Sequence, residues 1–406
     1  MNTADNSHMD RRAFLKNASV VAGGVFLASR FSSTAFAAPV AGDGPYGPRL
    51  ATNADGIQLP KGFTSRLIAT SGVPIANTSY TWHFDPDGGA CVPLDGGGWV
   101  YVSNCETTDG KGGVSAIAFD AAGAITNAYS ILSGTTRSCS GGMTPWGTYL
   151  SGEENGDIGR VFECNPMRRS QGVHRPLLGA FAHEMITVDP GTGVVYMVED
   201  RPTGRLYRFE PLRAGDLTAG NLFAARVASN GSVSWESTNT VAPNRTATTV
   251  AFNGGEGAWI MRGSLYFTTK GDVRVWQLNL RTQELSVFYD ASTVWATSLD
   301  AVDNLVGHDA SGDLFVAEDG GNLEVGLLNT YGAPTVAPFL RFVGHDQSEV
   351  SGIAFNPDGT RFYVASQRGT DGVTGRVYEI SGRFRRPKKR FEFRTAIEQR
   401  CVRTCR

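Results

Sequence analysis

One short segment, CSGGMTPWGTYLSGEE, combines a soft sulfur donor with two hard oxygen donors. Cys139 opens the segment, and Glu153 and Glu154 close it after a Thr-Pro-Trp-Gly turn. Carboxylate oxygens are ligands for calcium, whereas a thiolate favours iron or zinc. The segment therefore predicts one edge of a metal site, provided that other segments bring further ligands to the same place.

Ligand-type residues recur around six similar β patterns, WVYVSNCE, WGTYLSGEE, VVYMVED, SLYFTTKGD, DLFVAED and RFYVASQR. A first set lies about ten to sixteen residues before the central aromatic residue of each pattern: Asp85 and Asp87, Cys139, His183 and Glu184, Glu256, Asp303 and Asn304, and Glu349. A second set lies three to five residues after it: Glu106, Glu153 and Glu154, Glu199 and Asp200, Lys270, Glu318 and Asp319, and Gln367.

The spacing of these patterns predicts the fold that positions both sets. The central aromatic residues are Tyr101, Tyr149, Tyr196, Tyr266, Phe315 and Tyr363, separated by 48, 47, 70, 49 and 48 residues. Apolar β units at a period near 48 indicate an all-β, six-bladed β-propeller, and the long third gap holds an insertion at about residues 210–250. A β-sandwich with accidental spacing is the alternative.

In a propeller, the innermost strand of each blade lines a central channel. Equivalent positions in six blades would therefore bring the two sets of side chains together near one end of that channel. Crowded carboxylates raise one another's pKa unless a cation lies between them. Lys270 is either a structural counter-ion or a ligand for an anionic substrate, and Arg201, which follows Asp200, has the same two interpretations.

The first 37 residues are typical of a twin-arginine export signal. Arg11 and Arg12 precede an apolar stretch at residues 18–28, and Ala35-Phe36-Ala37 is a cleavage-site pattern. The apolar stretch is shorter than the ~20 residues that a spanning helix needs, so no stable membrane span is expected. We predict removal of residues 1–37 and delivery by the twin-arginine export machinery to the periplasm or the medium.

Charge is distributed unevenly along the chain. Residues 38–382 carry a formal charge of −12, once the four basic and two acidic residues of 1–37 and the ten and two of 383–406 are set aside. An acidic body disfavours nucleic acid as a partner and suits a protein that binds cations. We expect the basic tail, residues 383–406, to be a solvated appendage.

Six cysteines in an exported chain first suggest disulfides. They are Cys91, Cys105, Cys139, Cys164, Cys401 and Cys405. The sequence leaves their pairing open.

Several motifs, in order, resemble the PhoX family of bacterial alkaline phosphatases over about residues 55–380. They are CSGGMTPWGTYLSGEE, GAFAHEMITVDP, VVYMVEDRPTGRLYRFEP, FNGGEGAWI with LYFTTKGDVRVW, DNLVGHDASGDLFVAEDGG, and SEVSGIAFNPDGTRFYVASQ. The resemblance implies a six-bladed propeller that holds iron and calcium in its channel and hydrolyses phosphate monoesters of small organic substrates outside the cytoplasmic membrane.

Residues in these motifs become metal-ligand candidates by the same resemblance. Cys139 matches the family's thiolate donor to iron, and the acids of the motifs are further candidates: Glu154, Glu184, Glu256, Glu318, Asp319 and Glu349. Glu106 and Asp200, from the second set, complete the predicted metal ligands. Lys270 and Arg201 are the predicted phosphate-binding residues, because cations neutralise the charge of phosphoryl oxygens.

Two other function classes fit the same pattern. A calcium-dependent lactonase or diesterase on a propeller would use fewer acids and no thiolate, so iron bound through Cys139 would distinguish the phosphatase. A propeller can also be a non-catalytic interaction platform, with residues 210–250 as its contact surface.

Overall fold

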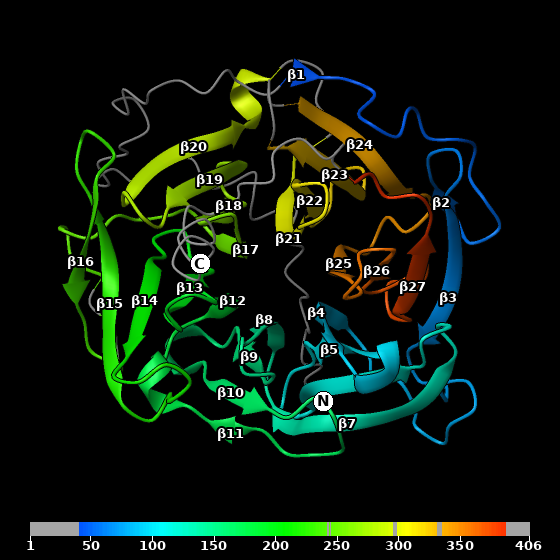
Figure 1. Cartoon of the computed structure of the whole chain (residues 1–406), viewed down its shortest axis with the longest axis horizontal. Helices are drawn as coiled ribbons and strands as arrows, with labels where there is room; N and C mark the ends of the chain where they lie inside the picture. The colour runs from blue at the N-terminus through cyan, green and yellow to red at the C-terminus, as the bar shows by residue number, and fades with distance from the viewer. Residues whose placement is uncertain (1–39, 242, 244, 295–298, 331–334, 387–406) are drawn as a thin grey trace, which may run out of the picture.

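The computed structural model describes residues 40–386 except 242, 244, 295–298 and 331–334. The described chain forms six antiparallel sheets arranged radially around one axis, which is a six-bladed β-propeller (Figure 1). The predicted fold class is confirmed. The predicted export signal, residues 1–37, and residues 387–406 of the basic tail lie outside the described residues. Among the described residues, the helices are short 3-10 turns, and none is long and apolar enough to cross a membrane.

Each blade begins with its innermost strand and continues outward in chain order. Blade 1 holds β4 (Pro86–Pro93), β5 (Trp99–Cys105), β6 (Gly112–Phe119) and β7 (Ile125–Thr135). Blade 2 holds β8 (Ser138–Met143), β9 (Tyr149–Glu153), β10 (Val161–Cys164) and β11 (Val173–His174). Blade 3 holds β12 (His183–Val188), β13 (Val195–Glu199), β14 (Leu206–Pro211), β15 (Gly220–Val227) and β16 (Val233–Ser237). The sequence region predicted to be an insertion thus supplies two outer strands of blade 3.

The remaining blades complete the ring. Blade 4 holds β17 (Gly255–Met261), β18 (Ser264–Thr269), β19 (Arg274–Asn279) and β20 (Glu284–Asp290). Blade 5 holds β21 (Val302–His308), β22 (Asp313–Glu318), β23 (Glu324–Asn329) and β24 (Thr335–Phe342), to which β1 (Val40–Ala41) and β2 (Ile57–Gln58) add at the outer edge. Blade 6 holds β25 (Val350–Phe355), β26 (Arg361–Ser366), β27 (Arg376–Ser381) and, from the start of the chain, β3 (Thr64–Thr70).

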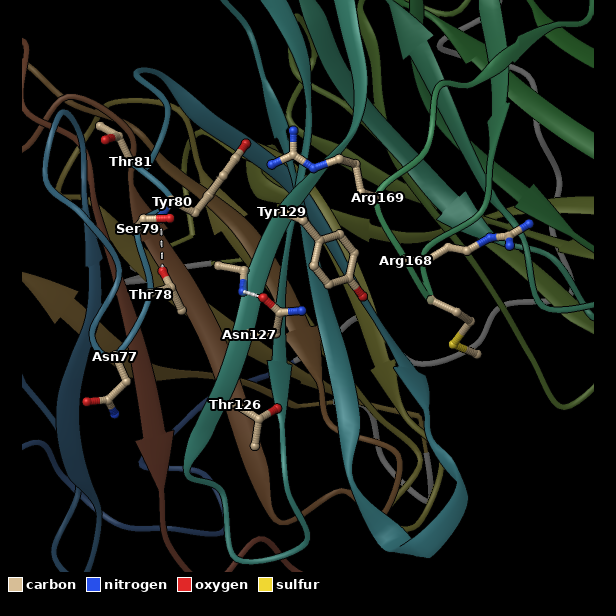
Figure 2. Close-up of a pocket in the computed structure, with 12 residues that line it drawn as sticks. Asn77, Thr78, Ser79, Tyr80, Thr81, Thr126, Asn127, Tyr129, Arg168 and Arg169 are labelled. Carbon is tan, nitrogen blue, oxygen red and sulfur yellow. Dashed lines mark hydrogen bonds between the residues drawn. The ribbon is translucent and has the colours of Figure 1, made fainter.

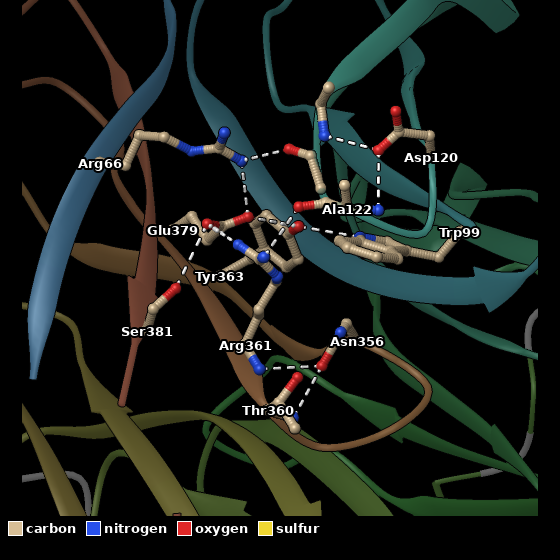
Figure 3. A network of polar contacts seen from close by, with 12 residues as sticks. Arg66, Trp99, Asp120, Ala122, Asn356, Thr360, Arg361, Tyr363, Glu379 and Ser381 are labelled. Carbon is tan, nitrogen blue, oxygen red and sulfur yellow. Dashed lines mark hydrogen bonds and ion pairs between the residues drawn. The ribbon is translucent and has the colours of Figure 1, made fainter. Parts of the chain in front are cut away.

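The ring is closed by pairing chain segments from its two ends. β3 pairs antiparallel with β27, so blade 6 contains residues from both ends of the propeller. Around this joint, Arg66 and Arg361 both form ion pairs with the buried carboxylate of Glu379 (Figure 3). Glu379 also accepts a hydrogen bond from the hydroxyl of Tyr363, which in turn accepts one from Trp99 of blade 1. The network therefore ties blade 6 to blade 1.

The apolar core lies between neighbouring blades. The six aromatic residues of the repeat are all buried, and the rings of Tyr101 and Tyr363 stack 4.7 Å apart across the joint between blades 1 and 6. Burial of large side chains between the sheets is the main favourable contribution to closing the ring. The aromatic period of the sequence is thus the period of this core.

A β-bulge near the start of every innermost strand positions the site. The register between the first and second strands shifts after Asp87, Ser138, His183, Gly255, Val302 and Ser351. Bulges bend a strand and redirect its side chains. The innermost strands also approach closely, since a Cβ on Gly88 would lie 2.5 Å from the Cα of Ser140 in the next blade.

Candidate metal centre

Five innermost strands present a ligand-type side chain at their second residue, beside the bulge. These residues are Asp87, Cys139, Glu184, Glu256 and Asp303, and all five are buried. Blade 6 departs from the pattern. Its equivalent residue is Ser351, whose hydroxyl donates to the carbonyl of Pro86 at 2.8 Å, and its acid, Glu349, directly precedes the strand. One member of the first predicted set therefore occupies the same structural position in each of blades 1 to 5, whereas Glu349 of blade 6 lies two residues before that position.

The second strands of three blades end in a pair of adjacent acids: Glu153–Glu154, Glu199–Asp200 and Glu318–Asp319. The two acids of a pair have different roles, and the first one accepts hydrogen bonds from the backbone. Glu153 accepts hydrogen bonds from Thr136 N at 2.9 Å and from Arg160 Nε at 2.7 Å. In blade 3, Glu199 accepts from Arg205 N at 3.1 Å and forms an ion pair with Arg245. These glutamates therefore hold both a turn within their own blade and a connection to a neighbouring blade.

Glu318 has the same surroundings in blade 5. Its two carboxylate oxygens accept from Asp300 N at 2.8 Å and from Glu324 N at 3.0 Å. Burial raises the pKa of Glu318 to about 8, although these backbone N–H groups lower it. Both oxygens thus accept from backbone N–H groups, which does not match the metal-ligand role predicted for Glu318.

The residue after each of these glutamates belongs to the channel. Glu154 interacts electrostatically with Glu106 and Asp200 from the neighbouring blades, and Asp319 interacts with Asp303 and Glu349. We use the name channel cluster for the five residues of the innermost strands together with Glu106, Glu154, Asp200, Asp319, Glu349 and one further residue. Its remaining member, Gln367, donates from its amide to Asp87 at 2.7 Å and to Glu106 at 3.0 Å.

Three groups within the channel cluster could each hold a metal ion. They are Asp87, Glu106 and Cys139; Cys139, Glu154 and Glu184; and Glu184, Glu256 and Asp303, each with ligand atoms within 4.8 Å of one another. Cys139 and Glu184 are each shared by two groups. The Sγ atom of Cys139 lies 3.1 Å from Glu184 Oε1 and 3.5 Å from Asp87 Oδ2. The three groups are therefore contiguous.

The electrostatics of the channel cluster favour bound cations. Burial, followed by repulsion from neighbouring acids, raises the pKa of Asp87, Glu154, Glu184, Glu256 and Glu349 well above the ordinary range. Burial and Asp319 raise the pKa of Asp303 to about 7. Burial, Asp87 and Glu184 likewise raise the pKa of the Cys139 thiol. A multivalent cation removes this repulsion, so the donor set fits metal ions.

Two basic side chains lie against the channel cluster. The ammonium group of Lys270 is 2.6 Å from Glu256 and 2.8 Å from Asp200. Burial alone would lower the pKa of Lys270, but these two carboxylates raise it well above its ordinary value. On another side, Arg368 forms an ion pair with Glu349 at 2.8 Å.

Arg201 is placed differently from Lys270. Its guanidinium pairs with the half-exposed Asp157 at 3.2 Å. The structure therefore brings Lys270 into the predicted site, whereas the charged end of Arg201 lies against an acid outside the channel cluster.

Cys139 is a free thiol, available as a ligand. Cys91, Cys105, Cys139 and Cys164 are all free, so the described part of the chain holds no disulfide among them. Cys401 and Cys405 lie outside the described residues.

Sequence reasoning singled out most of the channel cluster but not all of it. Asp87 and Asp303 belonged to the first predicted set but not to the final ligand predictions, and Arg368 was not noticed. The usable signal for both acids was their position, one residue into the innermost strand, as for Cys139 and Glu184. Arg368 lies five residues after Tyr363, the spacing that Glu106 and Glu154 have from Tyr101 and Tyr149, so its position was a usable signal as well.

Fold and site together define a class: a six-bladed β-propeller whose axial end carries a buried cluster of acids and one thiol. The family model described as alkaline phosphatase PhoX matches residues 120–158 and 156–260, about a third of the chain. The predicted resemblance to the PhoX family is confirmed, and it supports a hydrolase of the phosphatase type. No curated protein matches the chain.

Solved structures share the fold at low sequence identity. Pseudomonas fluorescens PhoX, solved in complex with vanadate, a transition state analogue, has a TM-score of 0.64 at 16% identity and covers 82% of this chain and 97% of its own. XC5397 from Xanthomonas campestris, a gluconolactonase, has a TM-score of 0.50 at 13% identity, with 84% and 98% covered. A structural genomics protein of unknown function from Bacteroides thetaiotaomicron has a TM-score of 0.50 at 10% identity, with 79% and 76% covered.

Proposed function

We propose that this protein is a metal-dependent phosphatase that hydrolyses phosphate monoesters at the channel cluster. The observation that carries the proposal is the set of three contiguous ligand groups joined by Cys139 and Glu184. A single structural calcium ion would gather its six to eight oxygen ligands around one point. Three groups that share members suit several closely spaced cations facing one substrate.

The donor types suggest which metals bind. We propose iron next to the Cys139 thiolate, and calcium where carboxylates alone surround the site, as around Glu184, Glu256 and Asp303. Glu106, Glu154, Asp200, Asp319 and Glu349 are proposed as the remaining ligands. When bound, these cations would neutralise the phosphoryl oxygens and supply Lewis-acid chemistry.

The chain's own residues would orient the substrate and fix the ligands. Lys270 is held at the cluster by Glu256 and Asp200, and its ammonium group is proposed to supply counter-charge to a phosphate dianion. Arg368 provides a second cation beside Glu349. Arg201, paired with Asp157, is proposed to add only a longer-range attraction. Gln367 fixes the orientation of Asp87 and Glu106 through its amide.

The proposed cell location follows the predicted export signal. A mature protein that begins after residue 37 would act in the periplasm or outside the cell on small phosphorylated organic molecules. Amino-terminal sequencing of the protein recovered from its own host tests the cleavage: a mature terminus at Ala38 supports it, and an intact Met1 contradicts it.

A direct assay tests the proposed reaction. The folded protein, supplied with iron and calcium, should hydrolyse p-nitrophenyl phosphate, and a calcium chelator should abolish hydrolysis. Gluconolactone hydrolysis in the same samples tests the lactonase alternative, which the shared fold of the Xanthomonas campestris enzyme suggests. Lactone hydrolysis without phosphatase activity would overturn the proposal.

Cys139→Ser separates an enzyme from an interaction platform. The serine keeps the size of the side chain but replaces the soft donor. We expect loss of iron and of hydrolysis in the phosphatase, whereas a platform without catalytic metals would tolerate the change. Unchanged iron content in this variant would contradict the assignment of iron to Cys139.

A further inference from the structure

A cavity that is chemically different from the channel cluster lies on the outer side of the propeller. It has a volume of about 550 Å³ and is formed by three segments: the loop at residues 77–81, strand β7 of blade 1, and the loop at residues 167–169 of blade 2 (Figure 2). Its volume is in the range of pockets that bind small molecules. Because β7 is the outermost strand of blade 1, the cavity is separate from the channel cluster.

The charge of this cavity is opposite to that of the channel. Two of its lining residues are arginines, Arg168 and Arg169, and none is an aspartate or glutamate. Arg169 extends toward Tyr80, whose hydroxyl it influences electrostatically, whereas Arg168 points away from the loop at residues 77–81 (Figure 2). Neither arginine forms an ion pair with another described residue. A guanidinium of this kind is a binding group for carboxylate or phosphate.

The other polar groups of the cavity are neutral. They are the hydroxyls of Thr78, Ser79, Tyr80, Thr81, Thr126 and Tyr129 and the amides of Asn77 and Asn127, from the loop at residues 77–81 and from β7. Asn127 uses its carbonyl oxygen to accept from Ala128 N at 2.9 Å, which leaves its amide nitrogen able to donate (Figure 2). A small inorganic anion would reach only the arginine end, whereas a hydroxyl-rich molecule would reach both walls.

The walls are held in place without a ligand. The hydroxyl of Tyr80 is 2.7 Å from Ser115 Oγ, and the hydroxyl of Tyr129 donates to Pro166 O at 2.9 Å. Ser170 N donates to Ser130 O at 3.2 Å, which fixes the arginine loop against β7. Loops anchored in this way preorganise a site and reduce the entropy cost of binding.

We propose that this cavity binds an anionic sugar, with Arg169 taking the carboxylate and Asn127 with the neighbouring hydroxyls taking the sugar hydroxyl groups. We call it the lateral site. Since a uronic acid is not a phosphate ester, its binding here is independent of the proposed phosphatase activity.

Titration calorimetry of the full chain tests the lateral site, with D-glucuronate, D-glucose and acetate as probes. We expect glucuronate to bind at least tenfold more tightly than either control, because only glucuronate engages both Arg169 and the neutral wall. Equal binding of all three probes, or no binding of glucuronate, would overturn the proposal.

Matched variants locate the bound sugar. Arg169→Ala should weaken glucuronate binding about tenfold or more, whereas Arg168→Ala, which removes the same charge but points away, should change it less than threefold. Asn127→Ala offers an independent test and should also weaken it, with little effect on acetate. Glu184→Gln, in the channel cluster, should leave glucuronate binding as in the wild type. Loss of glucuronate binding in Glu184→Gln, or wild-type affinity in Arg169→Ala, would show that the sugar does not bind at the lateral site.

Discussion

Adjacent acids in the same blade have opposite surroundings. Glu153 is met by a guanidinium and a backbone N–H group, so its charge is balanced by the protein itself. The next residue, Glu154, faces Glu106 and Asp200, and its pKa is raised by burial and by these acids. The pairs Glu199–Asp200 and Glu318–Asp319 repeat this division. One acid of each pair stabilises the blade, and the other belongs to the channel cluster, where Lys270 pairs with Asp200 but Glu154 faces mainly other acids.

The sharpest way to test this division is to remove the most shared acid of the channel cluster. Glu184 belongs to two of the three ligand groups. Glu184→Gln should lower phosphatase activity on the order of 100-fold or more, because the loss of one shared oxygen ligand weakens two ion sites. Activity and metal content are measured together, with the exposed Glu284→Gln as control. Wild-type metal content in Glu184→Gln would show that Glu184 is not a metal ligand.

The metal-free protein should become less stable as pH rises. Asp303 has a folded-state pKa of about 7, above its ordinary value of 3.8, so the folded state holds the proton more tightly than the unfolded chain. Its contribution is complete below about pH 4 and is lost as pH rises through 7, a change of up to about 4 kcal/mol. Urea unfolding of chelated protein between pH 4 and 8 measures this slope.

Metal should abolish that pH dependence. Cations replace the protons between the channel acids, so the loaded protein should keep its free energy of unfolding up to pH 8. Asp303→Asn should flatten the slope of the chelated protein. A chelated wild type whose stability rises across the same range would contradict the electrostatic description of the channel.

Loss of a backbone-supporting acid should affect stability and leave metal binding intact. Glu153→Gln removes the charge that Arg160 and Thr136 N share. Because Arg160 is nearly half exposed and screened by water, we expect a loss of only about 2–3 kcal/mol in the free energy of unfolding. Denaturant unfolding gives the loss, and elemental analysis of the folded variant should give wild-type metal content. Metal loss without destabilisation would show that Glu153 binds metal and does not stabilise the blade.

Phosphate binding by the basic residues gives the smallest expected effect. Lys270→Ala should raise KM for p-nitrophenyl phosphate about tenfold, which corresponds to about 1.4 kcal/mol. Lys270→Arg should retain much of the affinity, and Arg201→Ala should change KM threefold or less, because its guanidinium is engaged by Asp157. The exposed Lys111→Ala serves as control. Equal effects of the Lys270 and Arg201 substitutions would show that the channel does not distinguish them.

The fold was predictable because a large buried aromatic side chain recurs in every blade. Tyr101, Tyr149 and Phe315 belong to the aromatic repeat, and each is buried in an apolar core between two blades. Burial of large apolar groups leaves a strong pattern in sequence. The identity of the channel ligands was less predictable. Glu318 and Asp319 are equally acidic neighbours, and only the two backbone N–H groups that meet Glu318 distinguish them. Those contacts depend on turns that sequence patterns do not specify.

Elemental analysis of the folded wild-type protein, purified from a host that exports it, tests the central claim most directly. The account predicts more than one metal ion per chain, including iron and calcium, and simultaneous loss of the ions and of phosphate monoester hydrolysis on chelation. A metal-free protein that hydrolyses p-nitrophenyl phosphate at the same rate would contradict it.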